Sequence, residues 1–259
     1  MPVFLGGGDI VFVQRSGERG DDDTCSSGAP PPAAPSSLSD VWEFAVSRIH
    51  AISQPRSEKT NSLYYITRYL RTFHQQKNMN APEFPQILLD VKSRVEDLIC
   101  DYILDTTKNG TLSRGNLSFP PEFVERVKSM KSGKVEKDVY NYCLCNHYRN
   151  GEEYMGYHAD DEGSLDPHTP IASVSFGITR NFDIRAWKKK NGDAGGRPRL
   201  ARIALGDGDL LLMFPPMQCH YEHSIPVEKR AAGDRINLTF RRITTSTPRD
   251  DRCTCHSLK

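Results

Sequence analysis

The chain has 259 residues, which is enough for one domain with a sizeable hydrophobic core and some additional segments. Its formal net charge is +1 at pH 7, so it is not a uniformly basic nucleic-acid-binding protein, and phosphate contacts would need a local basic patch. No apolar run approaches the roughly 18 residues of a membrane span. Seven scattered cysteines are typical of free thiols in a reducing compartment, so we expect an intracellular protein, nuclear or cytoplasmic. We also expect a monomer.

Composition divides the chain into segments. Residues 1–16 form a short apolar segment to which the sequence assigns no role. Residues 17–38 are largely Pro, Gly, Ser and Asp and offer almost nothing to bury, so we predict a disordered linker. Residues 246–259 are predicted to be a flexible tail. The regular elements are therefore expected in two stretches, 39–138 and 139–245.

The stretch 39–138 is predicted to be mainly helical. Apolar residues recur at helical spacing over 39–52, over 85–102 and, more weakly, over 121–130. The second of these helices has a proline in its first turn, where proline is favoured. Residues 62–73 (SLYYITRYLRTF) mix aromatic and basic side chains, and their secondary structure stays open.

From about Val139 the pattern changes to strands. Short segments rich in β-branched and aromatic residues are separated by Gly, Asn, Asp and Pro: VYNYCLCNHY, IASVSFGI, NFDIRAW, RLARIAL, GDLLLMF and RINLTFRR. Six or more strands in about 110 residues favour a closed or two-sheet β structure. Helices packed on the outside of one sheet would make the fold class α+β.

A possible metal site begins at His158-Ala159-Asp160. Two histidines and one carboxylate on one face of iron(II) leave positions open for oxygen activation. On an extended segment residues i and i+2 point to the same side, so His158 and Asp160 could reach one metal. His220 and His223 are the candidates for the third ligand, and spacing alone does not choose between them. Alone, the triplet would most often be an incidental surface or turn element.

A second candidate feature is Arg235-Ile-Asn-Leu-Thr-Phe-Arg241. Its two arginines are six residues apart, an even offset that puts both on one face of a strand. Inward-facing arginines need anionic partners, because an unpaired buried charge is very costly. A dicarboxylate that also chelates iron would satisfy both through charge-assisted hydrogen bonds. The alternative is an edge strand with both arginines facing solvent.

These motifs together resemble the AlkB family of nucleic-acid dealkylating dioxygenases, and within it the animal DNA-repair type. The resemblance covers roughly residues 139–243 and rests on R-x-N-L-T-F-R at the end, preceded in order by Asn146-His-Tyr148, His158-Ala-Asp160-Asp-Glu162, PIASVSFG, Arg180-Asn-Phe182, GDGDLLLMF and EHSIP. It implies a double-stranded β-helix (jelly-roll) core in a dioxygenase domain over 139–245. N-terminal helices would pack on one sheet, and residues 39–138 would provide support and a nucleotide-recognition lid.

The resemblance also implies the cofactors and their ligands. It implies Fe(II), 2-oxoglutarate and O2, with His223 as the third metal and catalytic ligand beside His158 and Asp160. His220, three residues from His223, would then lie on the opposite face of the same strand. Arg235 would bind the distal carboxylate of 2-oxoglutarate, and Arg241 would lie near the carboxylate that chelates iron. The remaining implied contacts are with 2-oxoglutarate for Asn146, Tyr148 and Asn237, and with the flipped base for Glu162.

The implied activity is direct-reversal repair, by oxidative dealkylation of N-alkylated bases such as 1-methyladenine and 3-methylcytosine. DNA is the expected partner, with RNA as a second candidate. The target base must leave the stack, which calls for an aromatic platform. Tyr64, Tyr65 and Arg68 are candidates for it, although an ordinary amphipathic helix with buried tyrosines explains them equally well. Two other functions stay open: a dioxygenase of the same fold acting on a protein or small molecule, and a binding protein without metal.

Overall fold

The computed structural model describes residues 83–109, 119, 121–187, 197–215 and 217–244, and the backbones of three strands at 2–5, 9–14 and 61–66. The predictions for 17–38, for the helix at 39–52 and for the tail at 246–259 lie outside these residues. Within the described part of the chain, no helix has both the length and the apolar character needed to cross a bilayer.

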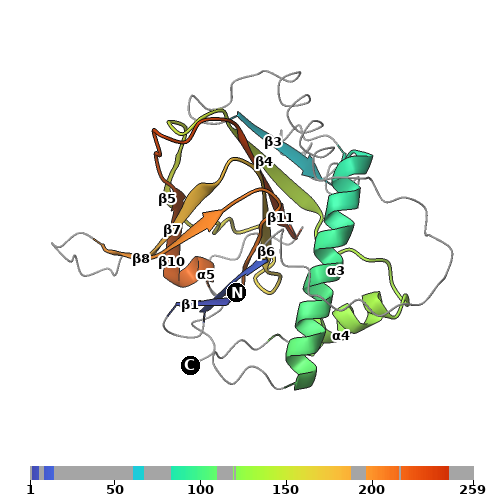
Figure 1. The fold of residues 1–259 in the computed structure, drawn as a ribbon. Helices are drawn as coiled ribbons and strands as arrows, with labels where there is room; N and C mark the ends of the chain where they lie inside the picture. Colours follow the sequence, from blue (N-terminus) through green and yellow to red (C-terminus); the bar gives the residue numbers. More distant parts are fainter. Residues whose placement is uncertain are drawn as a thin grey trace, which may run out of the picture.

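Two antiparallel sheets form the body of the protein (Figure 1). The larger has seven strands in the order β1 (Pro2–Leu5), β2 (Asp9–Gln14), β9 (Leu210–Met213), β6 (Ile171–Gly177), β11 (Arg235–Arg241), β4 (Tyr142–Tyr148) and β3 (Asn61–Ile66). The smaller has four strands in the order β5 (Met155–His158), β10 (Tyr221–Ile225), β7 (Arg180–Ala186) and β8 (Arg199–Leu205).

The chain crosses repeatedly between the two sheets. β4 is followed by β5, β6 by β7, β8 by β9 and β10 by β11, and in each pair one strand belongs to each sheet. This alternation gives two facing sheets, which agrees with the jelly-roll core implied by the sequence. A hydrophobic cluster lies between the sheets and draws on both, including Leu211 and Met213 of β9 and Ile184 of β7.

Two helices cover the other face of the larger sheet. α3 (Gln86–Asn109) and α4 (Pro121–Lys131) correspond to the helices expected at 85–102 and 121–130, and α3 extends beyond its apolar stripe. Ile99 and Ile103 of α3 and Val127 of α4 share one buried cluster with residues of β4, β6, β9 and β11. Figure 1 shows α3 running along the side of this sheet.

The pleat of β11 separates two environments. Ile236, Leu238 and Phe240 belong to the cluster beneath the helices. Because successive side chains of a strand point to opposite faces, Arg235 and Arg241 lie on the face toward the smaller sheet. β11 pairs with β4 on one side and β6 on the other, and both arginines are buried. The alternative of an edge strand with solvent-facing arginines is therefore wrong.

Several short elements were not expected from sequence. β5, β10 and the hairpin of β1 and β2 were not identified as strands, and Asn61–Ile66, left open, is strand β3. α5 (Met217–His220) is a single helical turn that ends at His220, and β10 begins at the next residue. The assumption that His220 and His223 lie on opposite faces of one strand is therefore wrong, because only His223 is in a strand.

Candidate metal and co-substrate site

Three residues come together at the edge of the smaller sheet. β5 and β10 run antiparallel, and their register places His158 directly opposite His223, with ring centroids 4.3 Å apart. Asp160 follows two residues after His158, and its backbone N–H donates to Oε1 of Gln218 in α5 at 2.9 Å. Their potential ligand atoms all lie within 4.8 Å of one another. This is a set of two nitrogens and one carboxylate oxygen, which suits iron(II).

The two imidazoles are oriented by their neighbours. Nδ1 of His158 lies 2.8 Å from the carbonyl oxygen of Gly156, which can only accept, so Nδ1 is the donor of this hydrogen bond and Nε2 is the nitrogen available to a metal. The ring of His223 stacks on Phe182 at 5.0 Å between centroids and 16° between planes. Its buried Nδ1 has no hydrogen-bond partner among the described residues. A cation bound to this nitrogen would satisfy it.

Burial and charge keep Asp160 and His223 in metal-binding protonation states. Burial alone would raise the pKa of Asp160, but the positive charge of Arg241 and the two histidines hold it below the usual value. Burial lowers the pKa of His223 to about 4. At neutral pH the site therefore presents an ionised carboxylate and a neutral imidazole, the forms that bind metals.

The low pKa of His223 predicts acid sensitivity of the metal-free protein. The unfolded state takes up this proton near the ordinary pKa of 6.5, and the folded state takes it up only near about 4. Stability should therefore fall as the pH drops from 6.5 to 4, by up to about 3 kcal/mol. Urea unfolding in the presence of a chelator measures this. His223→Gln lacks the titrating group and should flatten the dependence, and an unchanged slope in this variant would reject the explanation.

Arg235 is a buried cation with free donors. Its Nη2 donates to Ser175 Oγ at 2.9 Å and to Asn237 Oδ1 at 3.0 Å, and its guanidinium carbon lies 5.5 Å from the centre of the Tyr148 ring. Nε and Nη1 have no hydrogen-bond partner within the described residues. Burial lowers the pKa of Arg235 to about 10, so it is charged at neutral pH. Two unpaired donors on a buried cation are suited to a carboxylate.

The register of β4 and β11 gathers other polar residues near Arg235. Tyr148 is directly opposite Arg235, and Asn146 is directly opposite Asn237. All of them are buried. Asn237 accepts from Ser173 Oγ at 2.8 Å and donates to Thr239 Oγ1 at 2.7 Å, which fixes the orientation of its amide. The face toward the smaller sheet is therefore polar along this part of β11.

Arg241 joins the metal ligands to Glu162. Its Nη2 lies 2.7 Å from Oδ1 of Asp160, and its Nη1 lies 3.0 and 3.2 Å from the two carboxylate oxygens of Glu162. The side chain of Glu162 is 57% exposed, whereas that of Asp160 is 6% exposed. The carboxylate expected to contact a base thus lies at the surface beside the metal ligands. The buried Nε of Arg241 has no partner within the described residues.

The model of the 2OG-Fe(II) oxygenase superfamily matches residues 33–241. The chain belongs to this superfamily. The name of the superfamily refers to iron(II) and 2-oxoglutarate. The two histidines and the aspartate form a set that suits iron(II), and the buried arginine suits a carboxylate of 2-oxoglutarate.

Curated relatives agree with the resemblance to the AlkB family. The chain is 41% identical over 120 residues to human "DNA oxidative demethylase ALKBH2", covering 46% of each chain. It is 39% identical over 147 residues to the bovine protein of that name, covering 56% of this chain and 52% of the relative. It is 36% identical over 138 residues to mouse "Alpha-ketoglutarate-dependent dioxygenase alkB homolog 3", covering 51% and 48%. The matches span about half the length of these relatives.

A solved structure of OsALKBH1 supports the fold. It superimposes with a TM-score of 0.51 at 15% identity, over 93% of this chain and all of the other. At this identity the likeness concerns the fold alone, and it agrees with an oxygenase fold built on antiparallel sheets.

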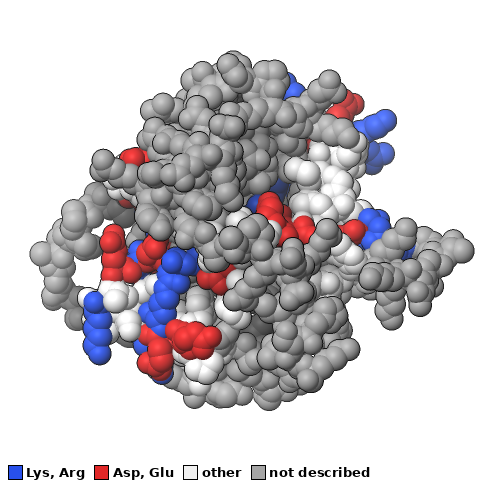
Figure 2. Space-filling view, turned by 180° about the vertical axis from the view of Figure 1, so that it is seen from behind, with Lys and Arg blue, Asp and Glu red and all other residues white. Residues whose placement is uncertain are grey.

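The structure describes only some of the other residues that were expected to contact the substrate. Tyr64 and Tyr65 lie in β3, at the edge of the larger sheet beside β4, and Arg68 lies outside the described residues. Residues 128–137 also include four lysines, and three of them pair with acids at 2.6 to 2.7 Å: Lys128 with Glu125, Lys131 with Asp101 and Lys137 with Asp97. On the face seen in Figure 2, described basic and acidic side chains lie next to one another.

Sequence reasoning missed some residues that organise the candidate site. Gln218 holds the backbone of Asp160, Phe182 supports the ring of His223, and Ser175 contacts Arg235. No local period marks these roles, because each contact joins segments that are distant in sequence. Phe182 and Ser175 do fall inside segments that resembled the AlkB family, which was the available indication of their place.

Proposed function

We propose that this protein is an Fe(II)- and 2-oxoglutarate-dependent dioxygenase. His158, Asp160 and His223 would hold the iron, and Arg235 would bind the distal carboxylate of 2-oxoglutarate. The observation that carries the proposal is that a three-residue metal set and a buried arginine with unpaired donors occupy the same two-sheet domain. The residues proposed to complete the co-substrate site are Asn146, Tyr148, Asn237 and Arg241.

The proposed reaction is an oxidative dealkylation. With iron, 2-oxoglutarate and O2 bound, one oxygen atom goes to the co-substrate, yielding succinate and carbon dioxide, and the other goes to the N-alkyl carbon, whose hydroxylated group leaves as an aldehyde. The chain's own residues bind and orient the reactants. Phe182 and Gly156 keep the imidazoles in place, and Arg241 keeps Asp160 ionised.

We propose N-alkylated bases in DNA as the substrate class. Relatives named DNA oxidative demethylase support this choice. So does Glu162, a half-exposed carboxylate held by Arg241 next to the metal set. A carboxylate at that place can accept a hydrogen bond from an exocyclic amine of a flipped base. We further propose that residues 39–138 include the nucleotide-recognition lid, to which Tyr64, Tyr65 and Arg68 would contribute.

Oligonucleotide turnover tests this function. With iron(II) and 2-oxoglutarate, the wild type should convert 1-methyladenine or 3-methylcytosine in single- or double-stranded DNA to the unmodified base, as measured by mass spectrometry. Glu162→Ala should lower this conversion by roughly tenfold or more, because it removes one base contact. Its consumption of 2-oxoglutarate without nucleic acid should stay near the wild-type value. RNA oligonucleotides carrying the same lesions form a parallel arm.

The rival function is oxidation of a protein or a small molecule by the same iron site. It predicts that 2-oxoglutarate is consumed while every alkylated oligonucleotide stays unchanged, and that result would reject our substrate assignment. A salt titration of DNA binding gives a second criterion, because affinity that depends on phosphate contacts must fall steeply with salt.

A further inference from the structure

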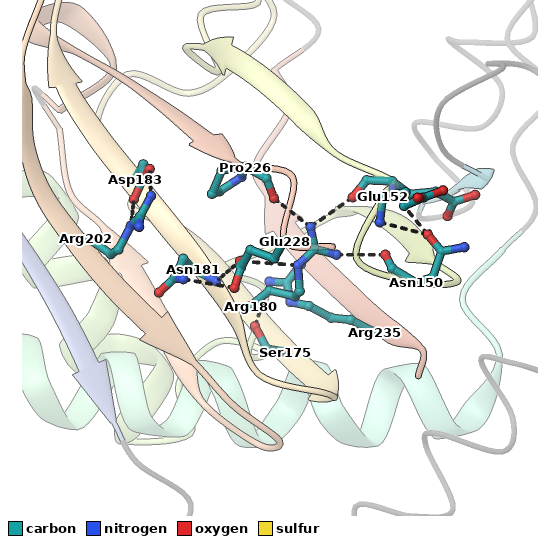
Figure 3. A network of polar contacts seen from close by, with 11 residues as sticks. Asn150, Glu152, Ser175, Arg180, Asn181, Asp183, Arg202, Pro226, Glu228 and Arg235 are labelled. Atoms are coloured by element: carbon teal, nitrogen blue, oxygen red, sulfur yellow. Dashed lines mark hydrogen bonds and ion pairs between the residues drawn. The ribbon is translucent and has the colours of Figure 1, made fainter. Parts of the chain in front are cut away.

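Arg180, the first residue of β7, is completely buried, and the described residues account for its hydrogen bonds (Figure 3). Nη1 donates to the carbonyl of Asn150 at 3.0 Å. Nη2 donates to the carbonyls of Glu153 at 2.9 Å and Pro226 at 2.7 Å. Nε lies 3.4 Å from a carboxylate oxygen of Glu228. A planar guanidinium can serve such a divergent set of acceptors, whereas the single ammonium of lysine cannot do so in this geometry.

The partners of Arg180 belong to connections between the two sheets. The loop 149–154 joins β4 to β5, and the loop 226–234 joins β10 to β11. Arg180 itself follows the turn from β6 to β7. Each of these three connections leads from one sheet to the other. One guanidinium therefore ties together three crossovers at the same end of the jelly roll.

The two loops also touch directly at Gly151. Its N–H donates to the carbonyl of Ala231 at 3.0 Å, and its own carbonyl accepts from the N–H of Glu228 at 2.7 Å. A Cβ added at Gly151 would lie 1.9 Å from the backbone oxygen of Glu228, so a side chain here would force the loops apart. Close backbone approach thus supports the contacts made by Arg180.

The tied end adjoins the candidate co-substrate site. Tyr148 is the last residue of β4, immediately before the first loop, and Arg235 is the first residue of β11, immediately after the second. The guanidinium of Arg180 lies 5.8 Å from the centre of the Tyr148 ring, and that of Arg235 lies 5.5 Å from it. The Tyr148 ring is therefore close to both cations.

Charge distinguishes the two arginines. Glu228 balances Arg180 and also accepts from the N–H and side-chain amide of Asn181, at 2.7 and 2.9 Å. The described side chains that accept from Arg235 are neutral, Ser175 and Asn237. Arg180 is thus satisfied by the protein, and Arg235 is left for an anion. These contacts indicate a structural role for Arg180 and a ligand-binding role for Arg235.

We propose that Arg180 is a positioning residue that sets the separation between the metal-binding histidines His158 and His223 on the smaller sheet and Arg235 on the larger one. This inference rests on the proposed function. 2-Oxoglutarate must reach the metal at one end and Arg235 at the other, so the separation of the sheets selects the length of the dicarboxylate. Loosening the tied end should weaken 2-oxoglutarate binding and relax the preference for its chain length.

Binding calorimetry with Mn(II) in place of iron tests the proposal. The ligands are 2-oxoglutarate, the four-carbon oxaloacetate and the six-carbon 2-oxoadipate, which carry the same charge, so the ratio of affinities reports length alone. Arg180→Lys keeps the charge but loses the planar set of guanidinium N–H donors, and Gly151→Ala separates the loops without changing the charge. We expect each to weaken 2-oxoglutarate binding by about tenfold and to lower its preference over the other two acids. Affinity for Mn(II) alone should stay within about twofold.

Arg202→Lys is the matched control, because Arg202 makes a two-pronged pair with Asp183 on the smaller sheet outside the tied connections, and it should leave both affinity and preference unchanged. Variants that retain wild-type affinity and preference would overturn the inference, as would loss of Mn(II) binding in parallel. If Arg180→Lys does not fold, the milder Glu228→Gln decides by the same ratio. A wild type that binds no 2-oxoglutarate would instead reject the proposed function.

Discussion

His223→Ala is expected to abolish iron binding and lower turnover by more than about a thousandfold, because it removes one of the three proposed protein ligands. Adding Fe(II) or Mn(II) should raise the melting temperature of the wild type, since a ligand that binds only the folded state stabilises it. The variant should lose this increase. Anaerobic metal titration by thermal shift, followed by an assay of succinate formation, measures both effects.

The neighbouring histidine provides the control for this experiment. His220 is three residues away, exposed and at the end of α5, and is absent from the metal set. His220→Ala should keep the metal-dependent increase in melting temperature and near-wild-type turnover. If His220→Ala loses metal binding and His223→Ala retains it, the assignment of the third ligand is reversed.

Arg235→Met should weaken 2-oxoglutarate binding by about 100-fold, because a carboxylate held by two charge-assisted hydrogen bonds loses both. The apo protein should nevertheless be as stable as the wild type or more so. Its wild-type guanidinium is buried with two unpaired donors, and replacing such a charge by an apolar side chain of similar length removes a desolvation cost. Calorimetry with 2-oxoglutarate and urea unfolding of the apo protein measure the two quantities separately.

Arg202→Met is the comparison for this variant. Arg202 is 40% exposed and pairs with Asp183, so its replacement should leave 2-oxoglutarate binding unchanged. If Arg235→Met destabilises the apo protein strongly and keeps its affinity for 2-oxoglutarate, then Arg235 is a structural residue and the co-substrate site lies elsewhere.

The parts of the fold with a strong local period were predictable. The apolar stripe of α3 and the β-branched alternation of β4, β6 and β11 come from side chains that repeat at 3.6 or 2 residues. The even spacing of Arg235 and Arg241 correctly placed both on one buried face. β5 and β10 have only four and five residues and include polar groups, so their local signal is too short to identify a strand.

The site depended more on contacts between distant segments. Nothing local distinguished His220 from His223, because the single helical turn that ends at His220 is too short to have a periodic pattern of its own. The resemblance to the AlkB family favoured His223, and the structure groups that residue with His158 and Asp160. The pairing of Arg241 with Asp160 and Glu162 was also unforeseen, since it joins the last residue of β11 to the segment that follows β5 in the other sheet.

The register of β11 determines which of its side chains reach the candidate site and which reach the hydrophobic core. Its odd-numbered residues face the candidate site, and its even-numbered residues face the helices. A shift of one position relative to β4 and β6 would turn Arg235 and Arg241 toward α3, and Ile236 and Leu238 toward the metal ligands. A molecule with this register error would lose both the arrangement of the candidate site and the packing of its hydrophobic core. A well-folded population with this strand out of register should therefore be vanishingly small, and a one-residue insertion in the loop before Arg235 has to be absorbed within the loop itself.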